Sequence, residues 1–220
     1  WPSVQPVAPL DCSMPYLARA TAFAPGSIGN LGPGLDTLGC AVEGAGDAVT
    51  AEWSNEPGIT LLDPGHPDLP RDPALHASAI AALAVIRRAT TLGATTPAQG
   101  ITLRVRKGLP LSAGQGGSAA SAVAGAAAVN ALIGGPLGRD ELLAAALVAE
   151  ERVAGRHLDN IAPSLMGGIV LIRSLDPMDV VAIPVPERLH IVLASPAQTL
   201  RTADTRAVLP GQVFREVAMH

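Results

Sequence analysis

Short stretches of alternating or clustered apolar residues recur along the chain and predict β-strands. Residues 100–106, GITLRVR, show the alternation most clearly, because every second side chain is apolar. The expected strands are 16–24, 47–53, 59–62, 100–106, 169–173 and 188–194.

Longer runs rich in alanine and leucine lie between these strands and predict helices. The expected helices are 74–92, 118–133 and 139–154, and residues 156–168 are expected to form a loop or a short helix. The glycine-rich segments 25–39 and 107–117 are expected to be loops, and the proline-rich segment 176–186 a linker. Strands and helices mix without an internal repeat, which favours an α+β fold over a doubly wound sheet.

Composition narrows the classes of function. Apolar residues make up 48% of the 220 positions but aromatic residues only 2%, so the core must be built from alanine, leucine, valine and isoleucine. The net charge is -4 and no basic block exists, so we expect no nucleic-acid partner. No apolar run is long enough to span a membrane. Cys12 and Cys40 cannot form a disulfide framework, and free thiols favour a reducing compartment such as the cytoplasm.

The glycine-rich segment 107–117 lies between an expected strand and an expected helix. Gly114, Gly116 and Gly117 carry no side chains, so their backbone N–H groups can approach an anion closely. Ser118 then opens the helix, whose first turn offers unpaired N–H donors and the positive end of the helix dipole. The pattern predicts a phosphate-binding loop, although a glycine-rich turn at a helix start also fits.

Two known phosphate-loop patterns fit this segment poorly. The P-loop pattern requires a lysine after its last glycine, where this chain has Ser118. The dinucleotide pattern G-x-G-x-x-G/A is met by Gly114, Gly116 and Ala119. However, the expected strand does not run directly into Gly114, and a helix follows where that fold needs a strand.

The segment resembles instead the second motif of the GHMP small-molecule kinases, P-x-x-x-G-x-G-S-S-A-A-S. This chain departs from the motif at Gln115 and Gly117. The resemblance implies that the segment wraps the triphosphate of ATP. The implied ATP contacts are Pro110, Leu111, Ser112, Ala113, Gly114, Gln115, Gly116, Gly117, Ser118, Ala119 and Ala120.

In that family a helix glutamate completes a magnesium site with the loop serine. The resemblance therefore places Mg²⁺ on Ser118 and Glu150, with Glu151 as the competing carboxylate. Mg²⁺ prefers oxygen ligands and keeps several waters, so one hydroxyl, one carboxylate and the ATP phosphates suffice.

The segment 24–39, APGSIGNLGPGLDTLG, resembles the first motif of one GHMP branch, the homoserine kinases. That motif reads A-P-x-S-x-x-N-L-G-x-G-F-D-x-x-G, and Leu35 replaces its phenylalanine. The resemblance implies that Asn30 and Asp36 contact the amino-acid substrate, and Asp36 is the candidate to orient or deprotonate the attacking hydroxyl. An amide and a carboxylate can bind an ammonium and a hydroxyl together.

Two later segments resemble the same branch. Residues 157–168 match H-x-D-N-x-A-P-x-x-x-G-G, which implies that His157 and Asp159 contact the substrate. Residues 202–210 resemble T-x-x-A-R-x-x-L-P, which implies that Arg206 binds the substrate carboxylate, with Arg201 as the alternative.

Together the four motifs imply an enzyme that uses ATP and Mg²⁺ to phosphorylate L-homoserine on its hydroxyl, giving O-phospho-L-homoserine for threonine biosynthesis. Helix 74–92 is where the family places adenine contacts, and His76 or Ser78 is the candidate. Another GHMP kinase, acting on mevalonate or a sugar, and a non-catalytic GHMP-like binding protein are the alternatives. A homodimer is also expected.

The resemblance implies a fold and a division of the chain. The implied α+β GHMP kinase fold has an N-terminal domain of the ribosomal protein S5 domain 2-like type and a ferredoxin-like C-terminal domain. Residues 14–179 would form the N-terminal ATP-binding domain and 180–220 the start of an incomplete C-terminal domain. Residues 1–13 would be an upstream extension or a cloning remnant. We expect weak turnover from a chain that stops there.

Overall fold

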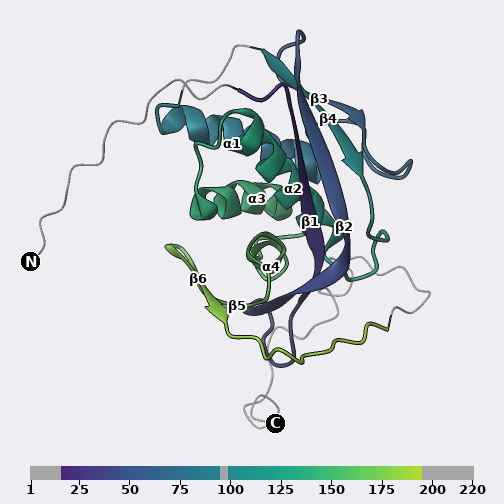
Figure 1. The fold of residues 1–220 in the computed structure, drawn as a ribbon, viewed down its shortest axis with the longest axis vertical. Helices are drawn as coiled ribbons and strands as arrows, with labels where there is room; N and C mark the ends of the chain where they lie inside the picture. The colour runs from purple at the N-terminus through teal and green to yellow at the C-terminus, as the bar shows by residue number, and fades with distance from the viewer. Residues whose placement is uncertain (1–15, 95–98, 195–220) are drawn as a thin grey trace, which may run out of the picture.

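A computed structural model describes residues 16–94 and 99–194, as one sheet with helices packed against it (Figure 1). The elements, in chain order, are β1 (Arg19–Gly29), β2 (Leu38–Ser54), β3 (Ile59–Asp63), α1 (Ala77–Thr91), β4 (Gly100–Arg106), α2 (Gly117–Leu132), α3 (Arg139–Val153), α4 (Ile161–Met166), β5 (Ile169–Leu175) and β6 (Met178–Ile183).

The 17-residue strand β2 organises the sheet. Its first three residues pair with β5 and its last seven with β4, both antiparallel, while β1 runs antiparallel to it along the other side. β3 lies parallel to β4 at one edge, and β6 pairs with β5 at the other. β2 therefore joins β4 and the edge strand β3 at one end of the sheet to β5 and the edge strand β6 at the other.

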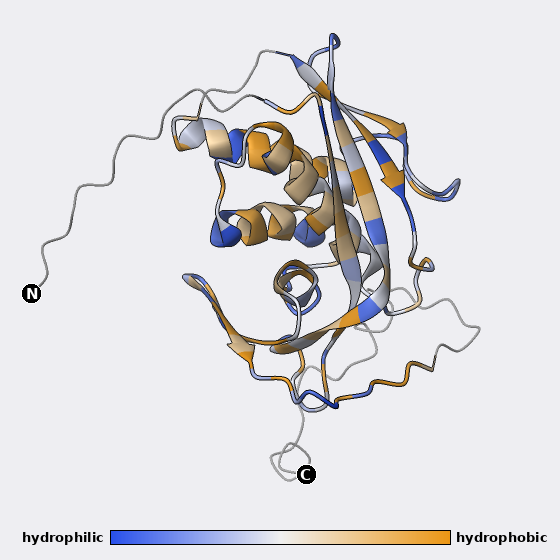
Figure 2. Cartoon of the chain, viewed as in Figure 1, coloured by the Kyte–Doolittle hydropathy of each residue, from blue (hydrophilic) through white to orange (hydrophobic). Residues whose placement is uncertain are grey.

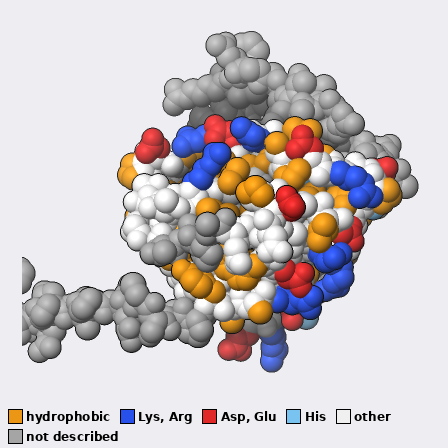
Figure 3. All heavy atoms as spheres, turned by 90° about the horizontal axis from the view of Figure 1, so that it is seen from above, with side chains coloured by type: hydrophobic (Ala, Val, Ile, Leu, Met, Phe, Trp, Pro, Cys, Tyr) orange, Lys and Arg blue, Asp and Glu red, His pale blue; other side chains and the backbone are white. Residues whose placement is uncertain are grey.

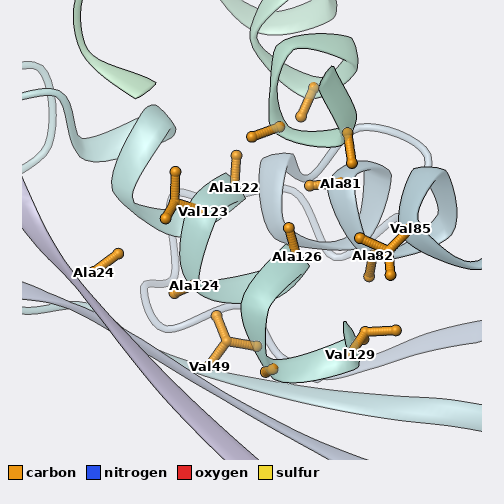
Figure 4. Packing of buried hydrophobic residues seen from close by; sticks show 14 of the residues in the cluster. Ala24, Val49, Ala81, Ala82, Val85, Ala122, Val123, Ala124, Ala126 and Val129 are labelled. Atoms are coloured by element: carbon orange, nitrogen blue, oxygen red, sulfur yellow. The ribbon is translucent and has the colours of Figure 1, made fainter. Parts of the chain in front are cut away.

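All four helices cover the same face of the sheet (Figure 1). α2 lies between the sheet and α1, and the helices turn their apolar residues inward (Figure 2). A side chain on Gly125 of α2 would lie 2.5 Å from the backbone oxygen of Ser78, so α1 and α2 touch almost backbone to backbone. Figure 4 shows the short side chains that fill this core: Ala24, Val49, Ala81, Ala82, Val85, Ala122, Val123, Ala124, Ala126 and Val129.

The three long helices agree with their predictions to within three residues at each end. Their alanine-rich patterns are unbroken, so local sequence was sufficient to find them. The short helix allowed within 156–168 forms as α4.

Three predictions about the strands and loops were wrong. The loop expected over 25–39 is confined to residues 30–37, because β1 continues to Gly29 and β2 begins at Leu38. The linker expected over 176–186 contains β6. The strand expected over 188–194 does not form among the described residues. β1 pairs with β2 and β6 with β5, whereas residues 188–194 pair with no strand among the described residues. Pairing between strands therefore decided the outcome, and local composition did not.

The surface carries charges of both signs. On the face seen in Figure 3, Lys and Arg side chains alternate with Asp and Glu, and apolar side chains lie between them. Across the part of the chain that the structure describes, no helix is both long and apolar enough to cross a membrane.

Candidate active site

The glycine-rich loop connects β4 to the start of α2, as its sequence predicted. Gly116 is the N-cap of α2 and has a φ of 64°, and Ser112 and Gly114 also have positive φ, at 54° and 70°. The N-cap provides no side-chain hydrogen bond, and the first turn of α2 contains no acidic residue. The helix therefore presents uncapped N–H groups and its positive dipole end to the loop, which is a site suited to an anion.

A side chain on Gly116 would collide with two neighbours. Its Cβ would lie 2.2 Å from Ser27 Oγ and 2.9 Å from Asn160 Oδ1. Ser27 donates from its hydroxyl to Asn160 Oδ1 at 3.0 Å, and from its backbone N–H to the carbonyl oxygen of Gln115 at 3.1 Å. Ser27 thus joins the glycine-rich loop, strand β1 and the residue before α4 at one point.

Ser118 and Glu150, expected to share a magnesium ion, lie in direct contact. The Ser118 hydroxyl donates to Glu150 Oε2 at 2.9 Å. Glu150 is only 5% exposed, and burial raises its pKa to about 7, against which the hydrogen bond from Ser118 acts in part. Glu151, the competing carboxylate, is exposed. The geometry therefore favours Glu150 over Glu151.

The predicted substrate residues Asn30, Asp36 and His157 form a second group. Asn30 and Asp36 have positive φ, at 57° and 58°, and the Asp36 N–H donates to Asn30 Oδ1 at 2.9 Å. Asp36 Oδ1 lies 3.2 Å from His157 Nδ1, and both side chains are partly exposed. The loop 30–37 thus holds the Asp36 carboxylate beside the imidazole of His157 at the surface.

Asp159, also a predicted substrate residue, lies deeper than its neighbours. It is 1% exposed, and a side chain on Gly29 would lie 2.1 Å from its Oδ2 atom, which has no hydrogen-bond partner. Burial and the charge of Asp36 raise the pKa of Asp159, and its charge in turn helps to raise the pKa of Glu150. Asp159 therefore lies between the Ser118–Glu150 pair and the Asp36–His157 pair.

The remaining expectations fall elsewhere. Arg206 and its alternative Arg201 lie outside the described residues. The adenine candidates His76 and Ser78 are buried and satisfy each other, because His76 Nδ1 lies 2.9 Å from Ser78 Oγ at the start of α1. They line no open surface, so that expectation does not fit the structure.

Sequence reasoning missed a buried ion pair beneath the glycine-rich loop. The glycine-rich loop itself, residues 108–117, ends with the first residue of α2, and Lys107 is the residue before it. Lys107 pairs with Asp47 of β2, and their side chains are 8% and 0% exposed. The position of Lys107 was the only sequence signal, since Asp47 lies 60 residues away.

Comparisons with known proteins identify relatives of this chain. Residues 77–168 match the GHMP kinases N terminal domain. The chain is 41% identical over 206 residues to homoserine kinase of Arabidopsis thaliana, and 37% identical over 209 residues to that of Chlorobium phaeobacteroides. These alignments cover 90% and 92% of this chain but 54% and 65% of the relatives, so the chain spans roughly half to two thirds of their length.

The crystal structure of homoserine kinase from Cytophaga hutchinsonii superposes with a TM-score of 0.79 at 36% identity. It covers 92% of this chain and 64% of that one. Lactococcus lactis galactokinase, at 16% identity and a TM-score of 0.57, shares the fold alone. The predicted GHMP kinase fold is thereby confirmed for the described residues, and residues 77–168 of this chain carry the N-terminal domain of the GHMP kinases.

Proposed function

We propose that this chain carries the nucleotide site and much of the acceptor site of a homoserine kinase, which transfers the γ-phosphoryl group of ATP to the hydroxyl of L-homoserine. The observation that carries the proposal is the contact between Ser118 and Glu150 at the uncapped start of α2. A kinase needs a hydroxyl and a carboxylate beside its phosphate-binding loop, whereas a purely structural turn needs neither.

The residues present fit a magnesium ion. Glu150 is a buried carboxylate whose raised pKa shows that its ionised form lacks compensation, and a bound cation would supply it. Ser118 and Glu150 would hold the ion, and magnesium would neutralise charge on the transferring phosphoryl group. Too few protein carboxylates converge for a closed site among the described residues, in keeping with an ion that takes its other ligands from water and nucleotide.

The acceptor side follows from the second group. Phosphoryl transfer depends mainly on alignment and charge stabilisation, so a strong general base is unnecessary. Asp36, held beside His157 at 3.2 Å, would receive a hydrogen bond from the homoserine hydroxyl and aim it at the γ-phosphorus. Asn30 would contact the substrate ammonium through its carbonyl oxygen, and Arg206 would bind the substrate carboxylate. The proposal places this step in threonine biosynthesis in the cytoplasm.

The test is ADP release in the presence of MgATP and a panel of acceptors: L-homoserine, L-serine, L-threonine, mevalonate and galactose. We expect release with L-homoserine and its loss in Ser118→Ala. Release with mevalonate or galactose alone would replace the substrate assignment by another within the family. If no acceptor supports turnover, calorimetry with MgATP decides, because an absence of binding contradicts the kinase proposal itself.

A further inference from the structure

Lys107 is the single lysine in a chain whose other strong bases are all arginine. It stands directly before the glycine-rich loop, where a positive charge would ordinarily be taken for a phosphate ligand. Its side chain is nevertheless only 8% exposed. A lysine is rarely buried to this extent unless the protein satisfies its charge and its donors.

The Lys107 ammonium has no donor left for a nucleotide. An ammonium carries three N–H donors. In this structure Lys107 Nζ donates to Asp47 Oδ2, to the carbonyl oxygen of Gly117 at 3.0 Å and to Ser121 Oγ at 3.1 Å. Each donor is matched by one acceptor, so the ammonium is used entirely inside the protein.

Asp47 completes the arrangement from the other side. Its Oδ1 accepts the N–H groups of Gly108 at 3.1 Å and Leu109 at 3.3 Å, which are the first residues of the loop. Its Oδ2 accepts the Ser121 hydroxyl at 2.7 Å, in the first turns of α2. One carboxylate–ammonium pair therefore binds the start of the loop and its end.

The segment between these two anchors needs such restraint. Its backbone enters the left-handed region at Ser112, Gly114 and Gly116, a conformation that a free chain adopts rarely for serine and without preference for glycine. Fixing both ends narrows the conformations open to the loop before any ligand arrives, which lowers the entropy lost on binding.

We propose that Asp47, Lys107 and Ser121, the anchor cluster, hold loop 108–117 in the conformation that receives a triphosphate, and that Lys107 is a positioning residue that does not touch the nucleotide. The inference rests on the proposed function only in taking a nucleoside triphosphate as the ligand.

Lys107→Arg separates this proposal from direct phosphate binding. Arginine keeps the positive charge, but its planar guanidinium cannot direct three donors from one nitrogen as an ammonium does. If charge alone mattered, the variant would bind MgATP normally. We expect its affinity for MgATP, measured by calorimetry, to fall at least ten-fold. In a chain that turns over, KM for ATP should rise while KM for the acceptor stays within two-fold.

Amide hydrogen exchange of the nucleotide-free protein provides the second readout. We expect exchange of the amides of 108–117 to accelerate at least ten-fold in Lys107→Arg, while the amides of β4 keep their protection. Ser121→Ala, which removes one acceptor and one donor from the anchor cluster, should show the same pattern at about three-fold. Ser121 is 3% exposed and cannot reach a ligand, so a phosphate-contact role could not explain that result.

A variant that removes one charge from a buried pair can fail to fold, because the remaining charge is uncompensated. The double variant Asp47→Asn/Lys107→Met leaves no buried charge and keeps the fold testable. It should still lose MgATP affinity and loop protection. The matched control is Arg173→Met/Asp179→Asn, which neutralises an ion pair that is exposed on β5 and β6, and it should change neither quantity.

The outcomes are separable. Normal MgATP affinity and unchanged loop exchange in Lys107→Arg and in the double variant would overturn the anchor cluster. Turnover of MgATP with another acceptor and not with homoserine would contradict the proposed substrate, and the Lys107 variants would still test the anchor cluster. If the unchanged chain does not bind MgATP at all, both proposals fall.

Discussion

The two sides of the candidate site are built in opposite ways. On the phosphate side, the anchor cluster is buried, and three hydrogen bonds use every donor of Lys107. On the acceptor side, the Asp36–His157 pair is partly exposed and is held by the short loop 30–37. Ser27 and Asn160 join the two sides.

The difference indicates how each side meets its ligand. A saturated, buried network leaves little freedom, so the phosphate side is preorganised before binding. A partly exposed contact between two side chains is weakly coupled to the fold, so the acceptor side can adjust when the substrate arrives. We therefore expect changes on the phosphate side and at the junction to alter stability and nucleotide binding together, and changes on the acceptor side to alter only catalysis.

Gly116→Ala should have the largest effect, because Gly116 packs against Ser27 and Asn160, the two residues that join the two sides. Alanine at a φ of 64° is strained, and its Cβ would lie 2.2 Å from Ser27 Oγ. Left-handed strain and overpacking together predict a loss of about 4 kcal/mol in the free energy of unfolding. Urea denaturation measures it. Gly114→Ala is the matched control, because its φ is 70° but nothing lies within 4 Å of the added methyl group, so it should lose only about 1 kcal/mol. Equal losses of unfolding free energy in the two variants would contradict the close packing of Gly116 against Ser27 and Asn160.

Glu150→Gln should stabilise the nucleotide-free protein while abolishing turnover. Burial raises the pKa of Glu150 to about 7 from 4.5. Because the folded pKa lies above the unfolded one, the stability that protonation provides is complete below pH 4.5 and is lost as the pH rises through 7. The variant should therefore exceed the unchanged protein by up to about 3 kcal/mol at pH 8, and by progressively less toward pH 5.

Unfolding titrations across that pH range test the Glu150 prediction. Glu151→Gln, at the neighbouring exposed position, is the control and should show a difference that does not vary with pH. A Glu150→Gln difference that is flat between pH 5 and 8 would mean that the carboxylate is compensated in the folded protein.

Ser27→Ala should cost about 1 to 2 kcal/mol. It removes the 3.0 Å hydrogen bond to Asn160 Oδ1 at a fully buried position and leaves that oxygen unpaired. Thr21→Ala on the same strand removes a 2.9 Å hydrogen bond to Thr50 at an exposed position and should cost less than about 0.5 kcal/mol. Chemical denaturation of both variants, combined with Asn160→Ala in a double-mutant cycle, measures the coupling. Additive effects would show that β1 and Asn160 are not coupled.

Asp36→Asn should leave the free energy of unfolding within about 0.5 kcal/mol, because the pair with His157 is partly exposed. Its effect should instead appear as at least a ten-fold lower kcat/KM for homoserine, with KM for ATP unchanged. Steady-state kinetics with each substrate varied separately gives both numbers. Unchanged turnover would remove Asp36 from the proposed role, and a clearly lower stability would remove the contrast between the two sides.

The fold could be predicted where local patterns are unbroken. Long alanine-rich runs located α1, α2 and α3. The strands were harder, because β1 passes through Pro25 and Gly26 with a change of register between Pro25 and Ser27. β2 likewise passes through several glycines. Such residues locally indicate loops, and only pairing with neighbouring strands keeps them extended.

The candidate site likewise has a part that local sequence patterns predicted and a part that they did not. The contact between Ser118 and Glu150 could be predicted, because family motifs mark both residues. The pair formed by Asp47 and Lys107 could not, since no local pattern connects a strand aspartate with a lysine 60 residues later. Asp47 and Lys107 restrain the loop because both are buried, and their burial is visible only in the folded chain.

The alanine-rich core offers a spectroscopic opportunity. In α2, which begins at the glycine-rich loop, the buried alanines include Ala119, Ala120 and Ala122. An alanine methyl group is attached directly to the backbone and has no rotamer of its own. Its motion therefore reports that of the helix. Selective labelling of alanine methyl groups would turn α2 into a row of reporters, whose signals record how a ligand at the loop stiffens the helix behind it.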